Sequence, residues 1–347
     1  MLTVKTFKED FPIRKNKKKI KVLICAGGGL FGYIITYLMS HLDFDLYSKV
    51  DVVSGSSIGG ILTLAYSVNS DYKLINYLFE QGAAKIFDKR FLGGIIGPKY
   101  DNKELENFIE NIVGDYKLSD INKISNKDLK LIVPTLDYTL TQPRIFTNID
   151  LEYAKEYDYP LKKIGIATAA APTYFPAVEY IWNEIEKNYE KMKELSIPSQ
   201  IYYLTQQAMK FRTDKSVLID SGVIENIPVI TTYTTLKSRY GINVEDIDMF
   251  IIGTGDDCSH PMETAKDVTN WTAVDWLVKF IIPYVTESNE LASVNFGAQM
   301  GFNSFEYYNP LTTCGDMDDP KILPTLKKQC DTIVDEFKSE IQAFLER

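Results

Sequence analysis

Two segments near the beginning of the chain share one pattern, in which an apolar run breaks into glycine and then continues with helical spacing. The first segment, residues 19–32, reads KIKVLICAGGGLFG, and the second, residues 50–60, reads VDVVSGSSIGG. Each pattern is typical of a buried parallel strand that is followed by a tight turn and a helix. Because parallel strands are joined through such helices, the two segments predict an α/β fold with a mostly parallel sheet.

The rest of the chain continues this alternation of strands and helices. Further strands are predicted at residues 129–135, 217–219 and 247–252, and helices at residues 30–42, 57–68, 71–85, 102–113, 162–171 and 322–345. We therefore expect three layers, α/β/α, with helices on both faces of the central sheet. A single domain is predicted over residues 1–347, with a core at about 19–256, a helical insertion at about 180–215 and a helical C-terminal part at 257–347.

Charge and composition narrow the classes of partner. A net charge of −9 and a pI near 5.0 argue against a general nucleic-acid-binding protein. The basic segment at residues 14–21 is either a solvated approach to the first strand or a weak contact with anionic lipid headgroups. No uninterrupted apolar run is long enough for a transmembrane segment. The four cysteines are scattered without a C-x-x-C pair, which indicates reduced thiols in a cytoplasmic or otherwise intracellular protein, with a peripheral position at membranes left open.

The first glycine-rich turn, residues 27–32, also fits the G-x-G-x-x-G pattern of dinucleotide-binding folds. Such a fold needs an acidic residue at the end of the second strand to hold the ribose. Here that strand ends in Ser54 and Gly55, and Asp51 lies at its beginning. The dinucleotide interpretation therefore lacks the acidic residue that would hold the ribose.

The second turn, residues 55–59, reads GSSIG and forms a G-x-S-x-G pattern centred on Ser57. A serine at such a strand-to-helix turn is exposed above the sheet, where it can act as a nucleophile. The bare backbone of Gly27–Gly29 can direct several N–H groups at one point, as an oxyanion requires. A third element, Asp220 in the sequence DSG, follows the predicted strand at 217–219.

Together these motifs resemble the patatin-like phospholipases, the family of patatin and, more distantly, of cytosolic phospholipase A2. That family carries G-G-G-x-[RK]-G, G-x-S-x-G and D-G-[GA] in this order, and the chain has GGGLFG, GSSIG and DSG at residues 27–32, 55–59 and 220–222. The stretch AAAPTYFP at 169–176 is similar to a helix-ending segment of the family, and Asn226 with Pro228 is similar to its N-x-P. The resemblance extends over residues 19–254.

Three features depart from the family pattern. Phe31 stands where the family has Arg or Lys, and Ser221 stands where it has Gly. The segment between Pro176 and Asp220 is longer than usual, which is the reason for predicting an insertion there. None of these departures removes a reacting group.

The resemblance implies a patatin-like fold and a lipid acyl hydrolase of the phospholipase A type. It implies a catalytic dyad of Ser57 and Asp220 and an acyl-serine intermediate, with neither a metal nor another cofactor. The implied substrate is a phospholipid or another acyl lipid at a membrane or micelle surface, and the need for a protein activator is left open. The implied oxyanion hole consists of Gly27, Gly28 and Gly29. The glycines that support the motifs are Gly32, Gly55, Gly59 and Gly222.

Two alternatives to an active dyad enzyme remain. His260 follows Ser57 and Asp220 in the chain order of an α/β-hydrolase triad, so a triad esterase is one of them. His41 is instead expected to be a surface or capping residue at the end of the first helix. A catalytically weak or inactive protein that binds lipid or a partner is the other alternative, because Phe31 breaks the first motif.

Overall fold

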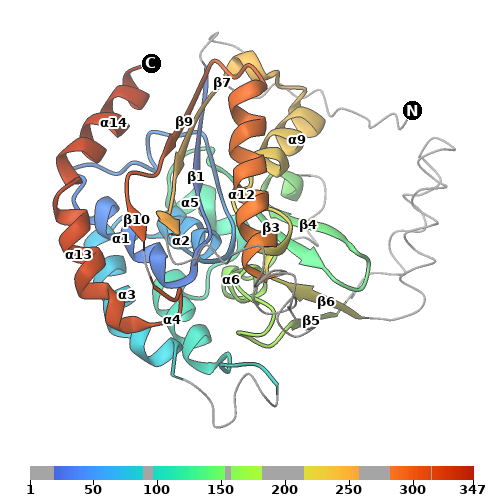
Figure 1. Ribbon diagram of the computed structural model, residues 1–347. Helices are drawn as coiled ribbons and strands as arrows, with labels where there is room; N and C mark the ends of the chain where they lie inside the picture. Colours follow the sequence, from blue (N-terminus) through green and yellow to red (C-terminus); the bar gives the residue numbers. More distant parts are fainter. Residues whose placement is uncertain (1–18, 89–96, 153–157, 182–214, 258–281, 314) are drawn as a thin grey trace, which may run out of the picture.

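The computed structural model describes residues 19–88, 97–152, 158–181, 215–257, 282–313 and 315–347 (Figure 1). Its centre is an eight-stranded sheet in the order β5-β6-β3-β2-β1-β7-β9, with β4 paired to β3. Its strands are β1 Ile20–Cys25, β2 Val52–Gly55, β3 Lys130–Asp137, β4 Gln142–Thr147, β5 Val178–Ile181, β6 Lys215–Ile219, β7 Ile247–Ile252 and β9 Ser304–Tyr308. Two short strands, β8 Asp256–Asp257 and β10 Thr312–Thr313, form a separate pair.

Helices cover both faces of this sheet, so the prediction of a three-layer α/β/α fold is confirmed (Figure 1). On one face lie α1 Gly32–Ser40, α2 Ser57–Val68, α3 Tyr72–Ile86, α4 Lys103–Val113, α6 Leu161–Thr168, α13 Leu323–Asp331 and α14 Val334–Glu346. On the other face lie α9 Val229–Tyr240 and α12 Ile282–Gln299. The remaining helical segments are α5 Ile121–Ile124 and the short 3-10 turns at Gly29–Phe31, Leu118–Asp120, Ile149–Glu152, Ser221–Val223, Val244–Asp246 and Pro320–Ile322.

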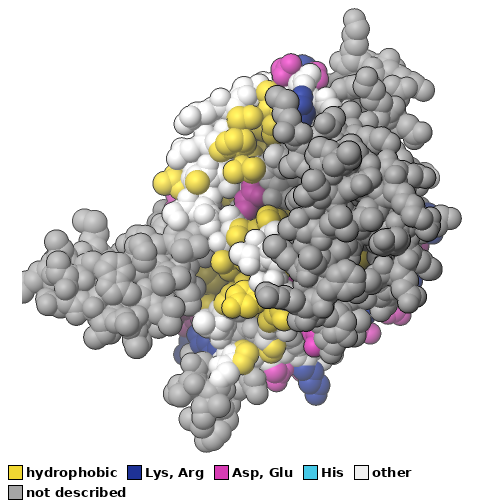
Figure 2. Space-filling view, turned by 90° about the vertical axis from the view of Figure 1, so that its right-hand side faces the viewer, with side chains coloured by type: hydrophobic (Ala, Val, Ile, Leu, Met, Phe, Trp, Pro, Cys, Tyr) yellow, Lys and Arg dark blue, Asp and Glu magenta, His cyan; other side chains and the backbone are white. Residues whose placement is uncertain are grey.

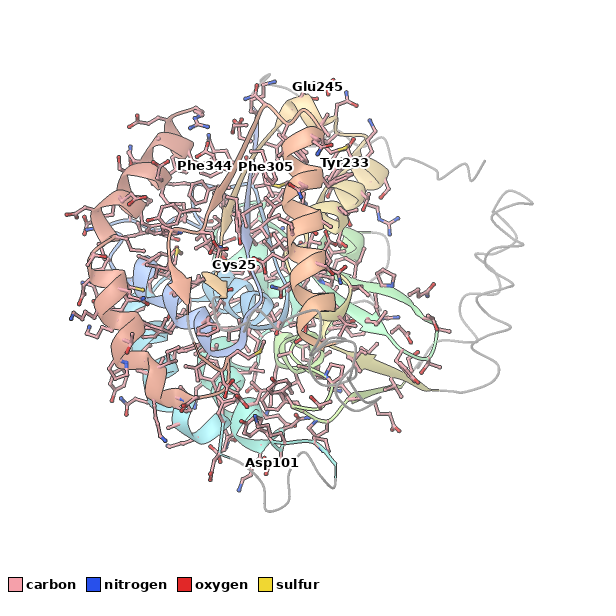
Figure 3. All side chains as sticks on the ribbon, viewed as in Figure 1. Cys25, Asp101, Tyr233, Glu245, Phe305 and Phe344 are labelled. Carbon is pink, nitrogen blue, oxygen red and sulfur yellow. The ribbon has the colours of Figure 1, made fainter. Side chains whose placement is uncertain are left out.

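The alternating side chains of the central strands feed two separate cores. In β1, Leu23 and Cys25 belong to the core under α1 and α2, whereas Ile24 belongs to the core under α9. Cys25, at the end of this strand, lies near the middle of the molecule (Figure 3). At the sheet edge, Phe305 of β9 packs against the α9 core and Phe344 of α14 is buried in the other. A strand buried on both faces needs apolar residues at every position, which explains the continuous apolar runs in the sequence.

The sheet is parallel on one side and antiparallel on the other. Strands β3, β2, β1, β7 and β9 pair in parallel, while β4 and β6 run antiparallel to β3 and β5 runs antiparallel to β6. At Ile132, β4 occupies one edge of β3 and β2 the other; at Leu136, β4 keeps its edge and β6 has taken the place of β2. Strands β2 and β6 therefore share one edge of β3 and approach each other head-on.

Several predicted elements agree with the structure from end to end, and others do not. The helix at 57–68 and the strand at 247–252 are observed with their predicted bounds. The helical insertion predicted at about 180–215 overlaps only the end of β5, which forms an antiparallel pair with β6. Residues 182–214 lie outside the described ranges, so the insertion stays a prediction. The predicted C-terminal helix is two helices, α13 and α14, and the C-terminal part also supplies β9, which the sequence analysis missed. Within the described ranges, none of the helices has the length and apolar character needed to cross a membrane.

Candidate active site

Ser57 begins α2 in a backbone conformation that is unusual for a residue with a side chain. Its φ is +53°, whereas Ser56 before it is extended. The turn is packed closely: a Cβ added to Gly59 would lie 2.2 Å from the Cys25 carbonyl oxygen, and one added to Gly55 would lie 2.3 Å from the Gly59 carbonyl oxygen. The two motif glycines therefore let α2 begin directly over the ends of β1 and β2, with the strain concentrated at the serine.

Asp220 follows the last residue of β6 and contacts this serine directly. The Ser57 hydroxyl donates a hydrogen bond of 2.6 Å to Asp220 Oδ2. The other carboxylate oxygen accepts the Gly222 N–H at 2.7 Å, and the Asp220 N–H donates to the Ala170 carbonyl oxygen at 3.0 Å. The head-on approach of β2 and β6 thus brings together two residues that are far apart in the sequence.

Burial changes the acid–base properties of Asp220. The residue is only 4% exposed, and desolvation raises its pKa from 3.8 to about 6, against the hydrogen bonds from Ser57 and Gly222, which lower it. The carboxyl group is therefore still ionised near neutral pH, but it is a stronger base than a solvated aspartate. This is the property that a proton acceptor for a serine hydroxyl needs.

Hydroxyl groups of Ser56, Thr168 and Ser221 form hydrogen bonds beside Ser57 and Asp220. The Thr168 Oγ1 accepts the Ser57 N–H at 3.2 Å and donates to the Pro134 carbonyl oxygen at 2.9 Å. The Ser56 and Ser221 hydroxyls are hydrogen-bonded to each other at 2.6 Å. Ser221 thus adds a hydroxyl contact that glycine would not supply. Thr168, at the end of α6, was not identified from the sequence because no motif marks it.

The glycine-rich loop lies against Ser57, and two of its N–H groups have no acceptor in the part of the chain that the structure describes. A Cβ added to Gly27 would lie 3.3 Å from the Ser57 Cβ. The Gly27 N–H donates to the Asn226 carbonyl oxygen at 3.0 Å, and the Leu30 N–H donates to the Met317 carbonyl oxygen at 2.8 Å. Between these two anchors, the N–H groups of Gly28 and Gly29 have no acceptor among the described residues. The prediction that Gly27 also supplies an oxyanion donor therefore needs correction, because its N–H is already used.

The conformation of the loop requires glycine at the two central positions. Gly28 has φ +147° and Gly29 has φ +57°, values that strain residues with side chains. Gly32 allows close packing instead, since a Cβ there would lie 2.5 Å from Ile58 Cγ1. Phe31, at the departure from the family pattern, is buried in the core with 6% of its surface exposed. Its ring contributes packing and no charge to the loop.

Of the two histidines considered from the sequence, the structure describes one. His41 caps the end of α1, where its Nδ1 lies 2.8 Å from the Tyr37 carbonyl oxygen and its ring lies 4.5 Å from that of Tyr37, in agreement with a capping role. His260 lies outside the described residues. Over the described ranges, no group of three or more His, Cys, Asp and Glu side chains is placed to hold a metal ion.

Comparisons with known proteins identify the family of the chain. Residues 23–233 match the model of the patatin-like phospholipase family. The chain is 25% identical to Patatin-like protein 2 of Oryza sativa subsp. indica, over 87% of this chain and 80% of that protein, and 25% identical to Patatin-17 of Solanum cardiophyllum, over 84% and 74%. The solved structure of VipD from Legionella pneumophila aligns with a TM-score of 0.40 at 10% identity, over 94% of this chain and 67% of that chain. Because the family model covers most of the chain, from β1 into α9, the protein belongs to the patatin-like phospholipase family.

Proposed function

We propose that the protein is a lipid acyl hydrolase of the phospholipase A type that uses a Ser57–Asp220 dyad. The observation that carries this proposal is the hydrogen bond of 2.6 Å from the Ser57 hydroxyl to Asp220 Oδ2. It is supported by the strained φ of the serine and by the adjacent Gly28 and Gly29 N–H groups. A nucleophile, a base and a pair of oxyanion donors are the groups that acyl transfer needs.

In the first half of the reaction, Ser57 Oγ attacks the ester carbonyl carbon while Asp220 Oδ2 accepts the hydroxyl proton. The carbonyl oxygen becomes an oxyanion, which receives hydrogen bonds from the Gly28 and Gly29 N–H groups. Each such donor contributes a few kcal/mol in related transition states. The bond to the leaving oxygen then breaks, Asp220 gives its proton to that oxygen, and an acyl-serine remains.

In the second half, water attacks the acyl-serine carbonyl carbon and Asp220 accepts a proton from the water. The same two N–H groups stabilise the second oxyanion. When this intermediate collapses, the proton passes from Asp220 to Ser57 Oγ, and the fatty acid is released. The raised pKa of Asp220 suits both directions of proton transfer, because it lies close to neutral pH.

The substrate class follows from the family, and the surface is compatible with it. We propose a phospholipid or another acylated lipid that is met at a membrane or micelle surface. Exposed apolar side chains include Leu291 of α12 and Tyr138, just beyond the end of β3. Figure 2 shows hydrophobic side chains gathered on the face that lies to the right in Figure 1. Apolar groups of this kind favour contact with lipid over contact with water.

A triad that includes His260 is the less favoured mechanism. In a triad, an imidazole lies between the serine and the carboxylate and hydrogen-bonds to both. Here Ser57 and Asp220 are already in direct contact, which leaves no space for a ring between them. A direct dyad is therefore the arrangement that the geometry favours.

The test is ester hydrolysis by the wild type and by Ser57→Ala, Asp220→Ala and His260→Ala variants, on a short-chain chromogenic ester and on phospholipid vesicles with chelator present. We expect loss of activity in the first two variants and retention in the third. Covalent labelling of the wild type, but not of Ser57→Ala, by a fluorophosphonate gives an independent measure of the nucleophile. Loss of activity in a folded His260→Ala protein would replace the dyad by a triad. A folded wild type that neither hydrolyses these substrates nor reacts with the fluorophosphonate would favour a binding protein.

A further inference from the structure

One of the two anchors of the glycine loop comes from the far C-terminal part of the chain. The Met317 carbonyl oxygen accepts the Leu30 N–H at 2.8 Å. The same oxygen would lie 2.8 Å from a Cβ added to Gly29, so it lies directly against the loop. The position of residues 315–319, here called the 315–319 loop, therefore determines where Gly29 and Leu30 lie.

The 315–319 loop is fastened by Asp318. This residue is 6% exposed, and its Oδ2 forms an ion pair with Lys99 and accepts a hydrogen bond from the Tyr100 hydroxyl. The Lys99 ammonium also lies 5.3 Å from the centre of the Tyr174 ring. A buried carboxylate with a cation and a hydroxyl partner is strongly fixed, because removing the cation leaves an uncompensated charge and removing the hydroxyl costs a hydrogen bond.

The partners of Asp318 are themselves tied to the catalytic region. The Lys99 N–H donates to the Thr173 carbonyl oxygen and the Tyr100 N–H to the Tyr174 carbonyl oxygen, both at 2.8 Å. Residues 173–174 follow shortly after Ala170, whose carbonyl oxygen accepts the Asp220 N–H. The glycine loop and the catalytic aspartate are thus both connected to the 170–174 segment, the glycine loop through the 315–319 loop.

We infer that Asp318 is a positioning residue, which through Lys99 and Tyr100 holds the Met317 carbonyl group against Leu30 and so keeps the Gly28 and Gly29 N–H groups aimed at the oxyanion. This inference rests on the proposed function. Glycines at positive φ have more accessible conformations than other residues, so a loop of this kind keeps one conformation only if its ends are fixed. The other end is fixed by Asn226, whose side chain donates to Glu290 Oε2 at 2.8 Å. Asp318 is the corresponding support at the Leu30 end.

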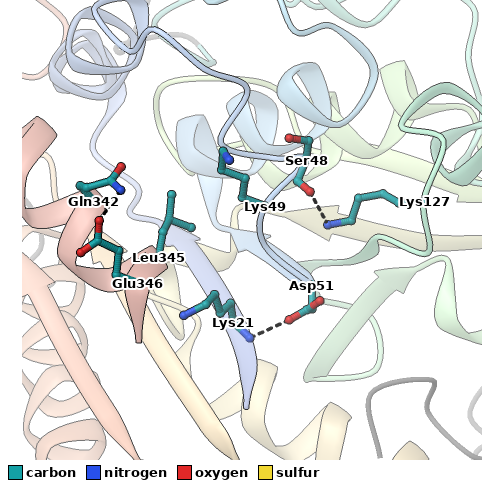
Figure 4. Close-up of a pocket in the computed structure, with 8 residues that line it drawn as sticks. All are labelled: Lys21, Ser48, Lys49, Asp51, Lys127, Gln342, Leu345 and Glu346. Atoms are coloured by element: carbon teal, nitrogen blue, oxygen red, sulfur yellow. Dashed lines mark hydrogen bonds between the residues drawn. The ribbon is translucent and has the colours of Figure 1, made fainter. Parts of the chain in front are cut away.

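The cavity at the opposite end of the sheet provides no such link. The ammonium groups of Lys21 and Lys127 in this cavity already have hydrogen-bond partners, and the cavity lies at the amino ends of β1 and β2 (Figure 4). The Asp318 contacts, in contrast, lead directly to groups that the reaction uses.

The test compares Asp318→Asn, Lys99→Met and the double variant with wild type. Asp316→Asn serves as the matched control, because it makes the same isosteric change in the same loop at an exposed position. Measured quantities are kcat and KM on a chromogenic ester, the thermal midpoint, and the hydrogen–deuterium exchange rate of the Leu30 amide. Tyr100→Phe is a milder variant that removes one hydrogen bond to Asp318 and keeps the ion pair.

We expect kcat to fall about 10- to 100-fold in Asp318→Asn and Lys99→Met, with KM within about twofold, since misplaced donors weaken transition-state binding more than substrate binding. The double variant is expected to match the single variants, because the two residues act as one unit. The Leu30 amide is expected to exchange faster in all three, and the control is expected to behave as wild type.

Two results would overturn the inference. One is an unchanged kcat together with a lowered thermal midpoint, which would make Asp318 a purely structural residue. The other is an unchanged exchange rate of the Leu30 amide in Asp318→Asn. This second readout does not depend on activity, so it decides the inference even if the wild type proves inactive and the proposed function fails.

Discussion

The two ends of strands β1 and β2 carry polar groups of opposite character. At the amino end lies a cavity of about 390 Å³, lined by lysines and by acidic side chains (Figure 4). There the buried Lys21 ammonium donates to the Phe344 carbonyl oxygen at 2.7 Å and lies 4.0 Å from Asp248 Oδ2. At the carboxyl end, Ser57 is strained and Asp220 is desolvated. A buried lysine is paired with a carboxylate at one end of the sheet, and Ser57 and Asp220 are held in unfavourable states at the other.

This difference predicts which substitutions should affect stability and which should affect activity. Buried charges with partners hold the strands together, and removing one of them destabilises the fold. Strain, desolvation and N–H groups without acceptors cost stability, and they persist where the surrounding structure enforces them, typically at sites of chemistry. Substitutions at the carboxyl end should therefore change activity more than stability, and substitutions at the amino end should change stability more than activity.

Asp220→Asn is expected to have the largest effect and to move activity and stability in opposite directions. The amide cannot accept the serine proton, so kcat should fall about 10²- to 10⁴-fold. The folded pKa of about 6 lies above 3.8, so ionised Asp220 destabilises the wild type by up to about 3 kcal/mol above pH 6, and this effect disappears as the pH falls towards 3.8. Urea unfolding near pH 8 should find the variant more stable than wild type. A variant that is less stable there would contradict the desolvation argument.

Lys21→Met is the corresponding change at the amino end. It leaves Asp248, which is fully buried, without its cation, so the free energy of unfolding should fall by about 3–5 kcal/mol. The matched control is Lys19→Met, whose partly exposed pair with Asp246 should contribute at most about 1 kcal/mol. Urea unfolding measures the stability, and ester hydrolysis per fluorophosphonate-labelled serine measures the activity. A large fall in activity per labelled serine would break the proposed division between the two ends.

Gly29→Ala tests the loop beside the nucleophile. The added Cβ would lie 2.8 Å from the Met317 carbonyl oxygen, so the loop must shift and kcat should fall about 100-fold. Gly114→Ala is a control at a similar positive φ, +59° against +57°, and its nearest contact would be at 3.7 Å. Both variants should lose stability, and only Gly29→Ala should lose kcat. Equal kcat values for the two variants would argue against an oxyanion role for the loop.

The pH dependence is the smallest expected effect. Asp220 must be ionised to accept the serine proton, so kcat/KM should fall about tenfold for each pH unit below 6 and level off above it. The rate of fluorophosphonate labelling should follow the same curve, because it depends on the same proton transfer. A flat profile between about pH 5 and pH 8 would show that Asp220 is not the base.

The sequence predicts the fully buried elements of the fold better than the partly exposed strands. The helix at 57–68 and the strand β7 agree with their predicted bounds because long apolar runs and motif glycines mark them. Strand β4 contains Pro143 and is partly exposed, and β9 is half-buried at the sheet edge, so neither has a clear periodicity.

The site divides in the same way. Ser57, Asp220 and the motif glycines are identifiable because their chemistry or conformation requires particular residue types. Thr168 is missed because a hydroxyl in a helix of small residues has no distinguishing pattern. The anchoring group of Met317 is a backbone carbonyl, which every residue possesses, so no residue type could have indicated it.

The head-on meeting of β2 and β6 along one edge of β3 sets the distance between Ser57 and Asp220. The pairing of Leu136 with Ile219 fixes the position of the end of β6 along β3. A shift by one residue would move that end by about 3.3 Å, which is too far for the same hydrogen bond to form. A single residue inserted into β6 would separate Asp220 from Ser57 and turn the carboxylate to the other face. For this contact to form, the end of β6 must therefore keep its register against β3 to within one residue.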